Sequence, residues 1–123
     1  MAYTAYVLDT QQLSALLDRF PPLFPKIIAH HITVEFGVPF NHQTPPEAVV
    51  EIIGERYSPT GIQALVCRVD GNERRPDNKF YHITWSLDPE KHKPVDSNNM
   101  LMSTGWDPIP TPIKINTIPS VLK

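Results

Sequence analysis

The sequence has little of several features that define common classes of protein. Its single cysteine, Cys67, excludes an intramolecular disulfide and a cysteine-based zinc site. No apolar run approaches the ~20 residues of a membrane span, and the N-terminal residues lack a charged segment followed by a hydrophobic one. A formal net charge of −2 argues against a protein that coats nucleic acid through its phosphates. We therefore expect a cytoplasmic protein with no membrane partner, in which one local pocket can still hold a small anion.

The chain has the length and composition of a single soluble domain covering residues 1–123. Its 123 residues are enough to bury a core, and 41% of them are hydrophobic. The 14 prolines punctuate loops and become dense after Trp106. Residues 107–123 are expected to pack on the domain as an edge strand, centred on residues 113–116, because proline is tolerated mainly at sheet edges.

Hydrophobic periodicity predicts about six strands and two helices. A capping-box pattern after Asp9 begins the first helix, which Pro21 and Pro22 end, and Ser97 is expected to cap the second helix. Residues 48–57 favour a strand, with a helix as the alternative. The predicted strands are residues 3–8, 29–36, 48–57, 62–69, 79–87 and 113–116.

One tripeptide occurs twice, as His31-Ile32-Thr33 and as His82-Ile83-Thr84. Each copy lies in a predicted strand, where alternate side chains point to the same face. The histidine and the threonine of each copy should therefore share one face, with apolar residues on the other. A single copy would occur easily by chance, but two copies in the same phase of two apolar strands indicate a paired function.

These twin motifs resemble those of the 2H phosphoesterase superfamily, which acts on 2′,3′-cyclic phosphates and related phosphodiesters. Residues 61–66 before the second motif and residues 93–98 after it are most similar to the small branch of cyclic phosphodiesterases and Swiss army knife RNA repair-like proteins. The resemblance covers roughly residues 3–103. It implies an α+β fold in which two antiparallel β-sheets form a central groove with helices on the outside.

The residues in the motifs suit metal-independent hydrolysis of a phosphodiester. Two imidazoles can act as acid and base near neutral pH, and hydroxyl groups can hold the charge on the phosphoryl oxygens. Aromatic side chains can also stack on a base. The predicted site has His31 and His82 as catalytic residues and Thr33, Thr84, Tyr81 and Trp106 as substrate-binding residues, with no metal and no cofactor.

The expected function is a phosphoric diester hydrolase that cleaves a 2′,3′-cyclic phosphate or a related nucleotide or RNA-end phosphodiester. Two alternatives stay open: a phage-type enzyme that degrades cyclic oligonucleotide immune signals, and a nucleotide- or RNA-binding domain without turnover. A zinc site built from His31, His82 and a carboxylate such as Glu35 is a further alternative.

Polar residues close to the motifs are expected to have structural or solvated roles. Strand alternation predicts that His30 faces away from His31, where it is expected to pack or to form a local hydrogen bond. Arg75 lies in a charged segment of residues 73–78 that is expected to be a solvated surface loop, although contact of Arg75 with phosphate stays an alternative. Asn98 is expected to help cap the second helix.

Overall fold

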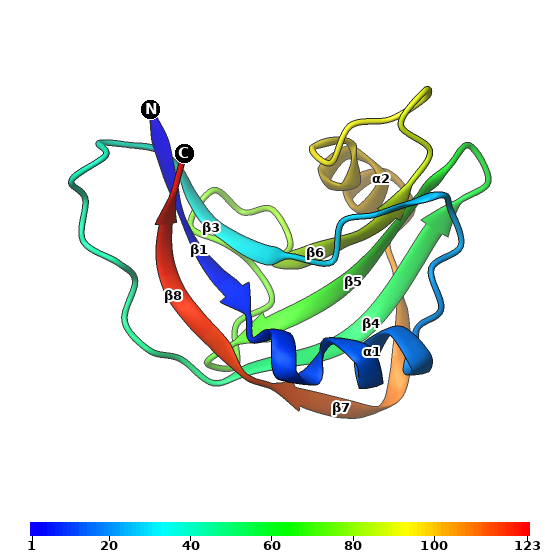
Figure 1. Ribbon diagram of the computed structural model, residues 1–123, viewed down its shortest axis with the longest axis horizontal. Coiled ribbons are helices and arrows are strands. Elements are labelled where there is room, and N and C mark those ends of the chain that lie inside the picture. The colour runs from blue at the N-terminus through cyan, green and yellow to red at the C-terminus, as the bar shows by residue number, and fades with distance from the viewer.

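The fold is a curled antiparallel sheet with two short helices, described for all 123 residues by a computed structural model (Figure 1). The sheet has eight strands in the order β7-β4-β5-β6-β3-β1-β8, and the short β2 pairs with β6. The elements are β1 (Ala2–Leu8), a 3-10 turn (Thr10–Gln12), α1 (Leu13–Arg19), β2 (Lys26–Ile27), β3 (His31–Val38), β4 (Val50–Ser58), β5 (Ile62–Val69), β6 (His82–Leu87), α2 (Asp96–Thr104), β7 (Asp107–Ile115) and β8 (Thr117–Leu122).

The mixed α+β class is confirmed, and so are the strands that carry both motifs. The segment predicted at residues 48–57 forms a strand, β4 (Val50–Ser58), rather than the alternative helix. The structure contains one continuous sheet in place of the expected two sheets, but the sheet has a natural division. Its two halves, β7-β4-β5-β6 and β3-β1-β8, are joined by a single residue pair, Ile32 with Ile83.

The C-terminal segment, expected to give one edge strand, forms two. β7 pairs with β4, and after Asn116 the chain continues into β8, which pairs with β1. The two strands are thus the opposite edges of the curled sheet, and β8 brings the C-terminus beside the N-terminus (Figure 1). β7 accommodates Pro108, Pro110 and Pro112 because one of its sides has no partner strand.

The two helices cover opposite faces of the sheet. Alternation along β5 sends Leu65 and Cys67 into the larger hydrophobic cluster, which includes Leu16 of α1, and sends Ala64 and Val66 into the smaller cluster, which includes Leu101 of α2. Neither helix has the length and apolar character that crossing a bilayer requires.

The motif strands follow this same division between faces. Ile32, Ile83 and Trp85 are buried in the larger cluster with α1. The intervening histidines and threonines consequently project from the α2 face of the sheet, at the seam between its two halves.

Candidate active site

A two-residue bulge brings the first motif into position. Upstream of the motif, the Ala29 amide donates to the Thr84 carbonyl at 3.0 Å, whereas Ile32 pairs with Ile83. Thr84 and Ile83 are neighbours on β6, but their partners Ala29 and Ile32 are separated by two extra residues, His30 and His31. Ala29 has φ 40, in the left-handed region, which is unusual for a residue with a side chain. Such irregularities commonly re-aim side chains beside active sites.

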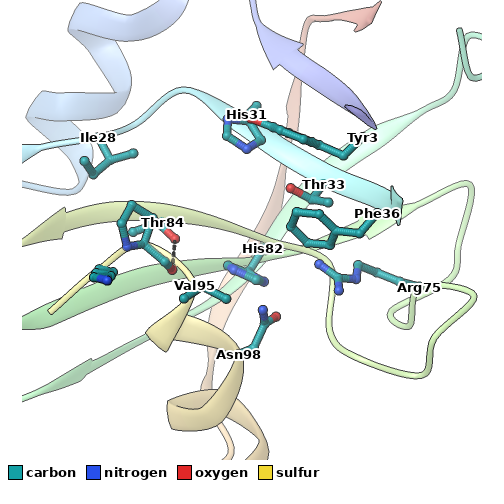
Figure 2. Close-up of a pocket in the computed structure, with 12 residues that line it drawn as sticks. Tyr3, Ile28, His31, Thr33, Phe36, Arg75, His82, Thr84, Val95 and Asn98 are labelled. Carbon is teal, nitrogen blue, oxygen red and sulfur yellow. Dashed lines mark hydrogen bonds between the residues drawn. The ribbon is translucent and has the colours of Figure 1, made fainter. Parts of the chain in front are cut away.

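The four polar residues of the twin motifs line one pocket with a volume of about 340 Å³ (Figure 2). At the Ile32–Ile83 register, Thr33 of β3 lies alongside His82 of β6. The chain leading into α2 closes the opposite wall. The other lining residues are Tyr3, Ile28, Phe36, Arg75, Lys93, Pro94, Val95 and Asn98.

His82 is held in one orientation at the floor of this pocket. Its Nδ1 lies 3.0 Å from the carbonyl oxygen of Phe80, and because a carbonyl can only accept, Nδ1 carries the proton. In the neutral ring, Nε2 is then left with its lone pair. Burial lowers the pKa of His82 to about 4; the Phe80 hydrogen bond opposes this shift and the charge of Arg75 adds to it. At neutral pH the ring therefore has an unprotonated Nε2 that can accept a proton.

His31 pairs with its neighbour in the sequence. Its Nδ1 lies 3.0 Å from Nδ1 of His30, which leaves Nε2 as its nitrogen for the pocket. Burial lowers the pKa of His31 to about 4, and the charges of His30 and His82 act in the same direction. His30 makes a local hydrogen bond as expected, but the expectation that it faces away from His31 is wrong, because the bulge interrupts the regular alternation of the strand.

The two motif threonines differ in the state of their hydroxyl groups. Thr84 Oγ1 donates to the Pro94 carbonyl at 3.1 Å and lies 2.9 Å from Ser97 Oγ. The hydroxyl proton of Thr84 is thus used in the bond to Pro94, and the Ser97 hydroxyl donates to Thr84 Oγ1. Thr33 lines the pocket with no hydrogen bond from the rest of the protein. Thr33 therefore has a hydroxyl proton free for a ligand, whereas Thr84 fastens the wall that precedes α2.

Arg75 is the pocket residue that the sequence placed most wrongly. The loop of residues 73–78 was expected to be solvated, but Arg75 is buried, with 3% of its surface exposed. Nε and Nη2 donate to the two carboxylate oxygens of Asp77, and the guanidinium lies 5.5 Å from the centre of the Phe36 ring. Nη1 has no protein acceptor, so its N–H groups are available to a ligand anion.

The pocket as a whole favours a negatively charged ligand. Its lining contains two cations, Arg75 and Lys93, and no carboxylate, and the two histidines add ring nitrogens that carry no charge at pH 7. Asn98 also lines it, and its Oδ1 is the protein's one buried side-chain oxygen or nitrogen without a hydrogen bond. The expected capping role of Asn98 and Ser97 is absent, because Val95 occupies the N-cap of α2 and no side chain caps the helix.

The two aromatic residues predicted to bind substrate lie outside the pocket. Tyr81 is 7% exposed and belongs to the larger hydrophobic cluster on the α1 side. Trp106 packs edge-on against Phe80, with ring centres 6.2 Å apart, and lies so close to Gly54 that a side chain there would clash. The aromatic residues that do line the pocket are Tyr3 and Phe36, whose ring centres are 5.3 Å apart.

The carboxylate needed for the alternative zinc site does not join the two histidines in the pocket. No three His, Cys, Asp or Glu residues form a group able to hold a metal ion, and Glu35 does not line the pocket.

Comparison of the chain with protein-family models, with curated proteins and with solved structures gave no match. The resemblance to 2H phosphoesterases therefore rests on the twin motifs, and the function has to be argued from the chemistry of the pocket.

Proposed function

We propose that the protein is a metal-independent phosphodiesterase of the 2H phosphoesterase type, a phosphoric diester hydrolase acting on a 2′,3′-cyclic phosphate or a related phosphodiester of a nucleotide or RNA end. The observation that carries the proposal is the meeting of both histidines and both threonines of the twin motifs in one pocket lined by cations. In this proposal the substrate binds in that pocket, at the seam between the two halves of the one sheet.

The imidazole groups match the proton transfers of phosphodiester hydrolysis. A water molecule that attacks phosphorus has to lose a proton, and the departing oxygen has to gain one. His82 presents an unprotonated Nε2 that is fixed by its bond to Phe80, which suits the first task. His31 is then left for the second task.

Charge on the phosphoryl oxygens has its own set of donors. The free hydroxyl of Thr33 and the unpaired Nη1 of Arg75 belong to the pocket lining, and Lys93 adds a second cation. Donors that are already in place stabilise developing charge without a cost of reorganisation during the reaction. The substrate is accordingly an anion that places its phosphoryl group between these residues.

The test is turnover by the purified protein of a panel of 2′,3′-cyclic mononucleotides and of cyclic di- and trinucleotides, in the presence of EDTA. We expect hydrolysis of a 2′,3′-cyclic nucleotide, and loss of about 10²–10⁴-fold in rate for His82→Gln. His42→Gln is the matched control, because His42 is exposed and lies in a loop outside the pocket.

Each other result changes the conclusion. Turnover of cyclic oligonucleotides alone would favour the immune-signal alternative. Binding of nucleotides without turnover would favour a non-catalytic domain. Activity that EDTA abolishes and zinc restores would contradict the metal-independent mechanism.

A further inference from the structure

The proposed reaction leaves one proton without a source. Burial gives both pocket histidines a pKa of about 4, so both rings are neutral at pH 7. A neutral His82 is a suitable base, but a neutral His31 that gave up its only ring proton would become an anion. If the protein works as proposed above, His31 needs a second group that supplies a proton when its own departs.

The bulge in front of β3 provides such a group. The φ of 40 at Ala29 turns the chain so that His30, which regular alternation would place on the opposite face, lies beside His31. The two rings are 5.2 Å apart at 80°, with their Nδ1 atoms 3.0 Å from each other. Because nitrogen lone pairs cannot face each other at this distance, one of the two Nδ1 atoms carries a proton.

The position of His30 also connects the pair to water. His30 is exposed, whereas His31 is partly buried and lines the pocket. Nδ1 of His31 faces His30 and its Nε2 is left for the pocket, so the two rings form a path from solvent to the substrate.

We propose that His30 is a positioning residue that relays a proton from solvent, through the Nδ1–Nδ1 hydrogen bond, to His31, which makes His31 the general acid and His82 the general base. This assignment rests on the proposed function. It also gives a chemical role to the bulge, which the pairing of the two strands does not need.

The protons balance over one turnover. Water attacks phosphorus and passes a proton to Nε2 of His82, while the bond from phosphorus to the leaving ribose oxygen breaks. That oxygen takes the proton from Nε2 of His31. Nδ1 of His31 in turn takes the proton from Nδ1 of His30, and Nε2 of His30 takes one from water. In the return step Nε2 of His31 takes a proton from water in the pocket and its Nδ1 proton goes back to Nδ1 of His30. Nε2 of His30 and Nε2 of His82 then each release one proton to water, so no proton is gained or lost.

Other groups face His31 but none replaces His30. The Tyr3 ring on β1 lies with its centre 5.4 Å from that of His31. His82, Arg75 and Lys93 line the other walls of the pocket. His30 is the residue that hydrogen bonds to the His31 ring.

The experiment compares two substrates that differ in how much their leaving group needs a proton. One is a 2′,3′-cyclic nucleotide, which expels a ribose alkoxide. The other is a nucleoside p-nitrophenyl phosphodiester, which expels a phenolate that is stable without a proton. The variants are His30→Ala, which removes the relay, and His30→Asn, which keeps a hydrogen-bond donor near the position of Nδ1 but cannot supply a proton. His42→Ala is the control.

We expect both His30 variants to lose activity on the cyclic nucleotide, by up to the ~10²–10⁴-fold that positioned acid catalysis contributes. Both should keep near wild-type activity on the p-nitrophenyl substrate.

Two results would overturn the relay. If His30→Ala lost the same activity on both substrates and His30→Asn restored it, His30 would act only through packing or orientation. Wild-type rates in both variants would show that His30 has no part in the reaction. A wild-type protein that hydrolyses neither substrate would instead refute the proposed function itself, so the two failures are distinguishable.

Discussion

Acidification should destabilise this protein well above the pH at which carboxyl groups titrate. His31 and His82 have pKa values lowered from 6.5 to about 4 in the folded protein. An unfolded chain therefore binds more protons than the folded one between these two values, and the free energy of unfolding falls as pH falls. The contribution of both groups is fully present above pH 6.5 and is lost as the pH drops towards 4.

The size of this effect follows from the two pKa values. A group that is protonated in the unfolded chain alone costs about 1.4 kcal/mol of stability for each pH unit. From pH 7 to pH 5 this amounts to about 2 kcal/mol for each histidine. The pair contributes less than the sum of roughly 4 kcal/mol, because part of the His31 shift is caused by His82. That loss is a large part of the stability of an ordinary domain. Asp77 and Asp96, whose pKa values lie below the usual 3.8, act in the same direction at more acidic pH.

Urea unfolding at pH 7 and at pH 5, followed by the fluorescence of the two tryptophans, measures the effect. The double variant His31→Gln/His82→Gln should lose most of the pH dependence whatever its stability at pH 7, whereas His42→Gln should keep it. Equal stability of the wild type at both pH values, or an unchanged slope in the double variant, would refute the claim that the two rings are buried and neutral.

Three further predictions concern the donors around the pocket. Thr33→Val should leave stability nearly unchanged and lower the rate by about 10²–10³-fold, because its hydroxyl is free for the substrate, and comparing kcat with urea unfolding checks this. Thr84→Val should instead destabilise the protein by about 1–3 kcal/mol, because two hydrogen bonds to the wall before α2 are lost; intact stability would contradict the assignment. Arg75→Met should lower kcat/KM by about 10²–10³-fold and move the His82 limb of the rate profile to higher pH, because the guanidinium lowers the pKa of His82; a profile that does not move would contradict its place beside that ring.

Local patterns in the sequence were enough to predict the elements that carry the site. The turn at residues 58–61, followed by the mostly apolar residues 62–69, predicted the strand β5 with the same bounds. The phase of residues 82–85 correctly separated the face of His82 and Thr84 from that of Ile83 and Trp85. These features depend on side-chain periodicity, which neighbouring residues determine.

The residues that were misplaced depend on contacts between distant parts of the chain. His30 faces His31 because of a bulge whose existence rests on pairing with β6. Arg75 is buried because its loop folds back through Asp77 and lies near Phe36. The sequence held one signal for this loop. An arginine and an aspartate lie two residues apart in a segment next to a strand, and such a pair can form an ion pair.

The second motif shows that its sequence pattern does not by itself determine the role of each residue. Thr33 and Thr84 are equivalent in the sequence, yet Thr84 is committed to Pro94 and Ser97 of a wall that only the folded chain assembles. Tyr81 precedes a motif histidine, but strand alternation turns it into the core. The burial of Tyr81 could therefore have been predicted from strand alternation alone.

The central claim is that His31 and His82 act together on one phosphodiester, and a double-mutant cycle tests it most directly. The measurement is kcat/KM for a 2′,3′-cyclic nucleotide with the wild type, His31→Gln, His82→Gln and the double variant. We predict that each single change lowers the value by about 10²–10⁴-fold and that the double variant is little worse than either single variant, because groups that act as a unit are not additive. Losses that multiply in the double variant, or single variants that retain wild-type kcat/KM, would contradict the account.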